Sequence, residues 1–210
     1  MASSGGTILI TGPNGGLGVG FVAQLLKSPY ATTHTSVYAV RDPAKATALR
    51  SVLKNAPQAH KHVVLPLDLC SLDNVRAFAK DINARVAAGS LPPIQAMALV
   101  AGAKDTSSQK FSKDRFERTF AVNYLANFLL TLLLLQSMDK AKGRIVYLSS
   151  TSAFINWGVN SKLYSEDQRR TLVTSTENMA KGIEEYPDMD IMKTGERRYA
   201  LSKLLLIEWM

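Results

Sequence analysis

A glycine-rich stretch near the start of the chain, Thr11–Gly18 (TGPNGGLG), constrains the fold more than any other feature. The apolar run Thr7–Ile10 precedes it and predicts a buried strand. Residues Val19–Lys27 carry apolar side chains at helical spacing, which predicts a helix. Glycine permits positive φ and close approach of a ligand, and a helix start offers unpaired N–H groups. The stretch therefore predicts a phosphate-binding turn, with a purely structural turn as the alternative.

The spacing of these glycines narrows the choice of ligand. No register gives the common dinucleotide pattern G-x-G-x-x-G, and no Gly-Lys-Ser/Thr follows to make a P-loop. The pattern present is T-G-x-x-x-G-x-G. A glycine-rich turn alone is a weak indicator of a cofactor site, and it becomes a strong one only when residues later in the chain fit the same function.

Length and composition predict one domain with a sizeable core, because the chain has 210 residues, of which 46% are hydrophobic and 20% charged. The lone Cys70 excludes an internal disulfide and suits a reducing compartment. The first strand begins so early that we expect no signal peptide. The most apolar run, Phe128–Leu135, is too short to span a bilayer. We therefore expect a cytoplasmic protein without a membrane segment.

The net charge of +8 raises the question of nucleic-acid binding. The basic residues are scattered, and no run is longer than Arg169-Arg170 or Arg197-Arg198. A solvated basic surface is the favoured interpretation, and it would also attract an anionic cofactor. We expect no nucleic-acid partner.

Strand-like runs alternate with helical patterns along the chain, which predicts βαβ units and a parallel sheet. Further strands are predicted at about 36–40, 62–67, 94–100 and 143–150. Further helices are predicted at about 71–88, 112–138 and 177–186, and again from Tyr199. Pro66 fits only near the end of its strand.

The tip of the second strand bears on cofactor choice. In a dinucleotide fold an acidic residue there holds a free ribose 2′-hydroxyl, whereas an Arg holds a 2′-phosphate. Arg41 comes first after this strand, so we favour NADP(H) over NAD(H). The alternative is an exposed Arg41, with Asp42 capping a helix that starts at Pro43.

Two further groups of residues carry possible chemistry. Ser149 and Ser150 end the fifth strand, at the edge where open α/β sheets bind ligands. The three histidines lie near early strands, so a hydrolase triad is poorly supported. Tyr199 and Lys203 are four residues apart and share a helix face, where the ammonium would stabilise the phenolate. A phenol in this setting can exchange a proton with a carbonyl oxygen.

Taken in order, the glycine turn, Asn123, Ser150, Tyr199 and Lys203 resemble the short-chain dehydrogenase/reductase family over nearly the whole chain except one insert. The resemblance implies a doubly wound Rossmann-type α/β domain with strand order 3-2-1-4-5. It implies Tyr199 as acid/base, Lys203 as its partner and a ligand of the nicotinamide ribose, and Ser150, more than Ser149, as the group that polarises the substrate oxygen. Asn123 would kink its helix and hold a water against Lys203, whereas a satisfied core Asn is the alternative.

The resemblance also implies a set of cofactor-binding residues. They are Gly12, Asn14, Gly16, Leu17, Gly18, Arg41, Asp68, Leu69, Ala101, Gly102, Tyr199 and Lys203. Asp68 would border the adenine ring, or it would only cap the helix that starts near Ser71. The chain departs from the family at Val100-Ala101-Gly102, where Asn-Ala-Gly is usual. No metal is expected.

Residues 151–197 form an insertion within the single predicted domain 1–210. It looks like the insertion of carbonyl-reductase-like and retinol-dehydrogenase-like branches, and Phe154, Trp157 and Tyr164 would wall a substrate pocket. A surface excursion without function is the alternative. Family members continue beyond the Lys203 helix into two more strands, so we expect apolar residues of this helix and the fifth strand to lack cover.

The function predicted from the sequence is hydride transfer between NADP(H) and a small-molecule carbonyl or alcohol. The apolar insert favours a hydrophobic ketone or aldehyde. The alternative is a truncated, non-catalytic NADP-binding remnant that pairs with a partner. Substrate identity, reaction direction and oligomeric state stay open.

Overall fold

The computed structural model describes residues 5–154, 175–183 and 190–209. These residues group into two compact units, each of which is described by itself. The sheet unit comprises residues 5–69, 73–101 and 129–148. The helix unit comprises 70–72, 102–128 and the described residues from 149 onward.

The sheet unit contains five parallel strands in the order β3-β2-β1-β4-β5, which confirms the predicted topology. Their bounds are Thr7–Thr11 for β1, Thr35–Val40 for β2, Lys61–Pro66 for β3, Ile94–Leu99 for β4 and Arg144–Tyr147 for β5. Thr11 aligns with Ala39 and with Leu99, so the turns that follow these strands share one edge of the sheet. Pro66 ends the edge strand β3, where its missing N–H breaks no ladder.

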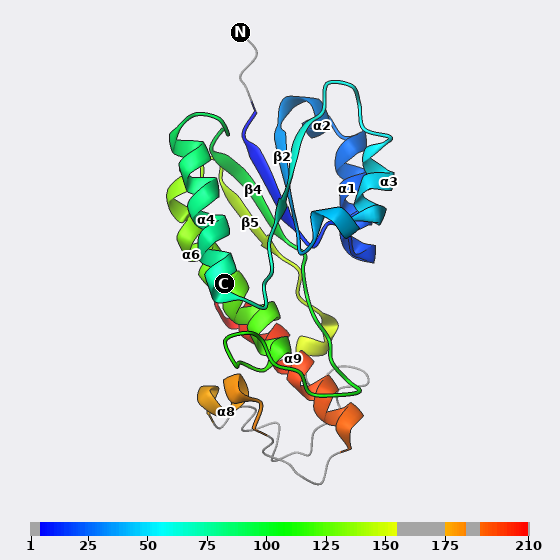
Figure 1. The fold of residues 1–210 in the computed structure, drawn as a ribbon, viewed down its shortest axis with the longest axis vertical. Helices are drawn as coiled ribbons and strands as arrows, with labels where there is room; N and C mark the ends of the chain where they lie inside the picture. The colour runs from blue at the N-terminus through cyan, green and yellow to red at the C-terminus, as the bar shows by residue number, and fades with distance from the viewer. Residues whose placement is uncertain (1–4, 155–174, 184–189, 210) are drawn as a thin grey trace. The chain divides into compact units, whose positions relative to one another are not determined.

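Helices cover both faces of this sheet (Figure 1). On one face lie α1 (Gly16–Lys27) and α3 (Thr47–Leu53), and on the other lie α4 (Leu72–Ala87) and α6 (Ala126–Leu134). Short α2 (Tyr30–Thr33), η1 (Pro43–Lys45) and η3 (Leu135–Ser137) complete the connections. Alternate residues of β1 and β2 pack against α1 and α3; this core contains Ile8, Ile10, Val22, Leu25, Leu26, Tyr38, Val40, Ala46, Leu49 and Ala98.

The helix unit contains α5 (Arg118–Phe120), the π-helical η2 (Ala121–Leu125), η4 (Thr151–Ala153), α8 (Thr176–Lys181) and α9 (Ile191–Trp209), and α6 starts in it. The predicted helix start at residue 112 is wrong. The chain turns first, with Arg115 at φ 64, and Glu117 then caps the helix by accepting the Phe120 N–H at 2.7 Å. Helix α8 ends at Gly182, whose φ of 65 stops it near Lys181 rather than at residue 186.

The predicted opening of the last helix at Tyr199 is also wrong, because α9 begins at Ile191. The Asp190 carboxylate accepts the Lys193 N–H at 2.9 Å and so satisfies a donor of the first turn. Tyr199 therefore lies in the middle of a 19-residue helix, flanked by helical residues on both sides.

Among the described residues, 118–137 form the only helical stretch that is long and apolar enough, by length and composition, to cross a membrane. Of the 18-residue apolar window within this stretch, 56% is buried inside the structure. A core helix of a soluble protein passes the same test.

Candidate active site

The glycine turn of the sheet unit is built so that two of its glycines cannot carry a side chain. A Cβ on Gly12, which has φ +67, would lie 2.7 Å from the Ala101 Cα. A Cβ on Gly18 would lie 2.1 Å from the Gly12 carbonyl oxygen. These close backbone approaches fold the turn tightly against the start of α1.

The start of α1 is open to a ligand. Gly15 caps it without a side-chain hydrogen bond, and its first turn holds no acidic residue. Gly15, Gly16 and Leu17 are exposed, Leu17 by 73%. Exposed N–H groups at the positive end of a helix suit a phosphate, so the turn fits the pyrophosphate of a dinucleotide. Asn14 serves this turn indirectly, since its side-chain oxygen accepts the Leu49 N–H at 3.0 Å and ties the turn to α3.

Arg41 follows β2 and is exposed, with no ion pair to any described carboxylate. Asp42 is occupied otherwise: it accepts the Ala44 N–H at 2.9 Å, caps η1 at Pro43 and pairs with Lys45 at 3.4 Å. The predicted cap is confirmed, and it leaves the Arg41 guanidinium available for an anion.

The other predicted cofactor residues of the sheet unit follow β3 and β4. Asp68 is half-buried and its N–H donates to the Asn74 side chain at 2.7 Å, and Leu69 is buried. Ala101 donates its N–H to the Thr11 hydroxyl at 3.2 Å, which links the ends of β1 and β4. Val100, which stands where the family has Asn, packs against the apolar core beneath α1.

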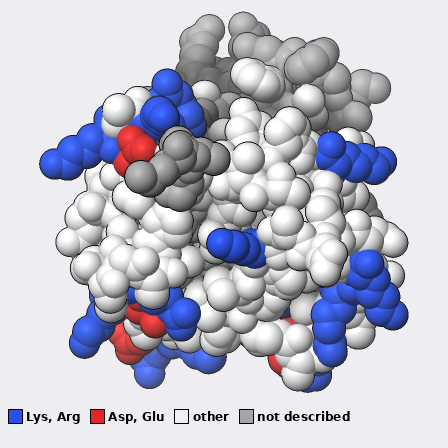
Figure 2. All heavy atoms as spheres, turned by 90° about the horizontal axis from the view of Figure 1, so that it is seen from above, with Lys and Arg blue, Asp and Glu red and all other residues white. Residues whose placement is uncertain are grey.

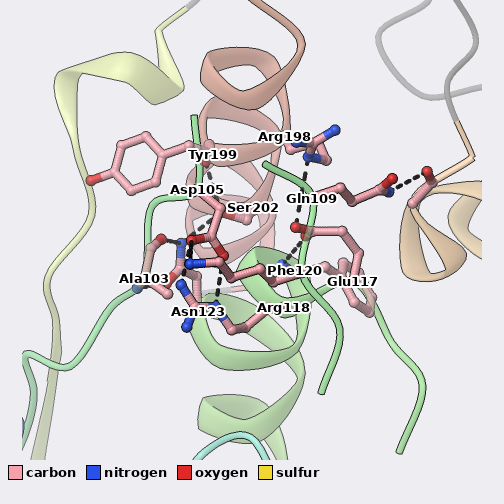
Figure 3. Close-up of polar contacts among 12 residues, drawn as sticks. Ala103, Asp105, Gln109, Glu117, Arg118, Phe120, Asn123, Arg198, Tyr199 and Ser202 are labelled. Carbon is pink, nitrogen blue, oxygen red and sulfur yellow. Dashed lines mark hydrogen bonds and ion pairs between the residues drawn. The ribbon is translucent and has the colours of Figure 1, made fainter. Parts of the chain in front are cut away.

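In the helix unit, Asn123 is fully buried and fully engaged (Figure 3). Its side-chain oxygen accepts the Ala103 N–H at 2.7 Å, and its nitrogen donates to the Ala103 carbonyl and the Ser202 hydroxyl, both at 2.9 Å. It lies in the π-helical turn η2, the break in regular helix that the resemblance implies. The Asn127 side chain donates to the Asn123 carbonyl at 3.0 Å. Asn123 and Asn127 therefore both stabilise this π-helical turn.

Lys203 lies beside Asn123 and is only 3% exposed. Burial lowers the pKa of its ammonium to about 8, because the charged form is poorly solvated there. A Cβ on Gly102 would lie 3.4 Å from the Lys203 Nζ and 3.3 Å from the Asn123 Oδ1. The structure thus brings together three of the predicted residues, Gly102, Asn123 and Lys203.

Tyr199 is half-buried, one turn before Lys203 on α9. The Lys203 Nζ lies 5.9 Å from the centre of its ring. The ring projects away from Asn123 and Arg118, and its backbone carbonyl accepts the Ser202 hydroxyl at 2.7 Å (Figure 3). The phenol is therefore clear of the buried network that holds the helix.

The two serines after β5 have different surroundings. The Ser149 hydroxyl donates to the Lys203 carbonyl at 3.0 Å and so is used to fix α9. The Ser150 hydroxyl accepts the Ser152 N–H at 3.2 Å, which leaves its own proton available to donate. The role of Ser150 as the hydroxyl that faces the substrate stays a prediction. Of the predicted pocket walls, Phe154 is exposed, and Trp157 and Tyr164 lie outside the described residues.

A buried ionic network in the helix unit was not predicted (Figure 3). Asp105, 6% exposed, pairs with Arg118 through two hydrogen bonds, one of them 2.6 Å from Nε. This hydrogen bonding raises the pKa of the Arg118 guanidinium. Glu117 lies 3.6 Å from the Arg198 Nε. These residues share no periodicity in the sequence, so no pattern could have found them.

The parallel sheet and its glycine turn are those of a dinucleotide-binding α/β protein. Tyr199 and Lys203 lie one turn apart on α9. Residues 6–165 match the sequence profile of the short chain dehydrogenases, and the chain belongs to that family. It is 39% identical over 95% of its length to short-chain dehydrogenase iccH of Talaromyces variabilis, and 34% identical over 70% to human retinol dehydrogenase 14. It spans 61% and 45% of those two relatives' lengths.

Among solved structures, NADPH-bound carbonyl reductase from chicken fatty liver has the same fold, with a TM-score of 0.62 at 20% identity. The match covers 97% of this chain and 67% of that one. The family and the fold class predicted from the sequence are therefore both confirmed.

Proposed function

We propose that the protein transfers hydride between NADP(H) and a carbonyl or alcohol substrate, most readily a hydrophobic ketone or aldehyde. The observation that carries this proposal is the burial of the Lys203 ammonium against Gly102 and Asn123, one helical turn from Tyr199. A buried, unsolvated lysine is costly to a fold, and its place beside a half-buried phenol gives it a chemical use.

The cofactor, when bound, supplies or accepts the hydride. The exposed N–H groups at the start of α1 would bind its pyrophosphate, and Gly12 and Gly18 permit the tight turn beneath it. Arg41 would bind a 2′-phosphate, the group that distinguishes NADP(H) from NAD(H). Support for NADP(H) also comes from the NADPH named in the chicken reductase structure.

Tyr199 would donate a proton to the carbonyl oxygen in reduction and accept it from the alcohol in oxidation. With a pKa of about 8, Lys203 is mostly charged at neutral pH and stabilises the phenolate. Ser150 would donate a hydrogen bond to the same substrate oxygen. Asn123 fixes the π turn against α9 through Ser202. Support for an apolar substrate comes from the name of the human relative, a retinol dehydrogenase.

The test is NADPH consumption with a panel of hydrophobic ketones and aldehydes, measured with wild type and Tyr199→Phe. Loss of the acid/base group should lower turnover by about a hundredfold or more. Tyr30→Phe is the matched control, because Tyr30 is 56% exposed on α2. Turnover that survives in Tyr199→Phe would contradict the assigned role. Cofactor binding without turnover of any substrate would favour the non-catalytic alternative.

A further inference from the structure

Lys104, in the loop that follows Gly102, lies over the proposed acid/base. Its Nζ is 5.1 Å from the centre of the Tyr199 ring, closer than the 5.9 Å of Lys203. The same Nζ lies 2.8 Å from the Glu196 carboxylate, one turn before Tyr199 on α9. The contact is partly exposed, with the Lys104 and Glu196 side chains 44% and 30% accessible.

The backbone on both sides of Lys104 is fixed, so its side chain starts from a defined place. Ala103 has its N–H and its carbonyl bound to the buried Asn123 amide. Asp105 is held by Arg118, as Figure 3 shows. The Asp105 carbonyl also approaches α9 so closely that a Cβ on Gly195 would lie 2.5 Å from it. The loop therefore presents Lys104 to α9 in a single register.

We propose that Lys104 is a positioning residue for Tyr199. Held by Glu196, its ammonium packs on the face of the ring, restricts how the ring turns and favours the phenolate over the phenol. An ammonium over an aromatic face is attracted by the ring quadrupole, and a positive charge at this distance stabilises a developing anion. The catalytic consequence rests on the function proposed above, whereas the contact itself does not.

The charged groups that face the Tyr199 ring within the described part of the chain determine the sign of the effect. Lys104 comes from the loop and Lys203 from α9, and Glu196 from α9 partly offsets Lys104. Lys104→Met removes one positive charge and leaves the Glu196 carboxylate without its ammonium. Both changes disfavour the phenolate, so phenolate formation should need a higher pH. In the double variant Lys104→Met/Glu196→Gln the unpaired Glu196 carboxylate is also removed, so part of the shift toward higher pH should be reversed.

The experiment is a spectroscopic titration of phenolate absorbance in the free protein. Subtracting the titration curve of Tyr199→Phe from that of wild type isolates the signal of Tyr199 from that of the other tyrosines. For each Lys104 variant, the curve of the same variant carrying Tyr199→Phe is subtracted. Lys104→Met should raise the titration midpoint by about 0.5–1 pH unit. Lys104→Arg should restore the wild-type midpoint, since it keeps a cation on the ring. Lys110→Met, in the same loop and 3.9 Å from Asp105, should change nothing.

Turnover provides a second, separable measurement. With NADPH and an active carbonyl substrate, kcat of Lys104→Met should fall several-fold while KM for NADPH stays the same, and Lys104→Arg should recover it. An unchanged titration midpoint in Lys104→Met would overturn the positioning role, whatever the turnover. If Lys104→Met shifts the midpoint but Tyr199→Phe leaves turnover unchanged, the contact between Lys104 and Tyr199 is supported and the proposed function is contradicted. Circular dichroism of each variant, compared with wild type, identifies any loss of fold.

Discussion

At the scale of single residues, the burial of Lys203 is a cost to the fold that the proposed function would explain. Its side chain is almost fully buried, and burial alone lowers the pKa of its ammonium from 10.5 to about 8. Because the unfolded chain leaves this ammonium in water, the folded protein pays a desolvation penalty whenever the group is charged. A methionine of similar length would avoid the penalty and, if the proposed function holds, lose the catalytic role.

We therefore expect Lys203→Met to be inactive and yet more stable than wild type at neutral pH. Between the folded pKa of about 8 and the ordinary 10.5, the unfolded state binds more protons, so wild-type stability rises with pH across this window. Below this pH window the desolvation penalty is complete and amounts to roughly 3–4 kcal/mol. The gain of Lys203→Met should thus be largest at neutral pH and shrink toward about pH 10, as measured by denaturant unfolding.

Lys80→Met is the matched control, since Lys80 is exposed on α4 and its replacement by Met removes no desolvation penalty. A Lys203→Met protein that is less stable than wild type at neutral pH would contradict this account of the penalty.

At the scale of elements, the loop after β4 is joined to the start of α5 by a shielded ion pair between Asp105 and Arg118. Asp105 is 5% exposed at its side chain and Arg118 is 25% exposed, so their pair is far better shielded than the exposed Asp73–Arg76 pair of α4. Glu117 and Gly195 add a helix cap and a close backbone approach on either side of this pair. Removing one partner should therefore affect the whole loop that presents Lys104.

Asp105→Ala is expected to destabilise the protein by about 2–4 kcal/mol, because it leaves a shielded guanidinium without its carboxylate. The double variant Asp105→Ala/Arg118→Met should recover part of this loss. Asp73→Ala should change the free energy of unfolding by less than about 1 kcal/mol. Denaturant unfolding of the four proteins measures these differences, and equal effects of Asp105→Ala and Asp73→Ala would show that the buried pair contributes nothing special.

The elements also show how far the sequence alone predicts the structure. The strands and the glycine turn were predictable, because apolar runs alternate regularly with helical patterns. The order of the strands followed from the resemblance to the short-chain dehydrogenase/reductase family. The start of α5 was not, because Glu117 caps it and donates its own N–H to the Ala180 carbonyl, a residue far along the chain. The start of α9 does carry a local sequence signal, since Asp190 is a favourable N-cap residue.

The site was predictable only where a motif exists. Asn123, Ser150, Tyr199 and Lys203 follow the family pattern, and the structure places Asn123 and Lys203 together. Lys104 is a loop residue in a polar stretch, and its contact with Tyr199 depends on how Ala103 and Asp105 are held. Contacts that form only in the tertiary structure have no periodic sequence pattern from which they could be predicted.

At the scale of the whole molecule, the net charge of +8 is spread rather than concentrated. Figure 2 shows Lys and Arg in separate groups on one face, with Asp or Glu beside some of them. A positive field of this kind attracts small anions. Binding of NADPH, which carries more negative charge than NADH, should benefit from it most.

We accordingly expect NADPH to raise the unfolding temperature more than NADH at equal concentration, by preferential binding to the folded state. The advantage should shrink as salt rises from about 50 mM to about 500 mM, because screening weakens the attraction. Arg41→Ala should weaken NADPH binding by about tenfold or more and leave NADH binding nearly unchanged, since only NADPH carries the 2′-phosphate. Lys27→Ala makes the same change in net charge at the far end of α1, where the side chain is exposed. If the two variants lose NADPH affinity equally, the general field and not Arg41 selects the cofactor.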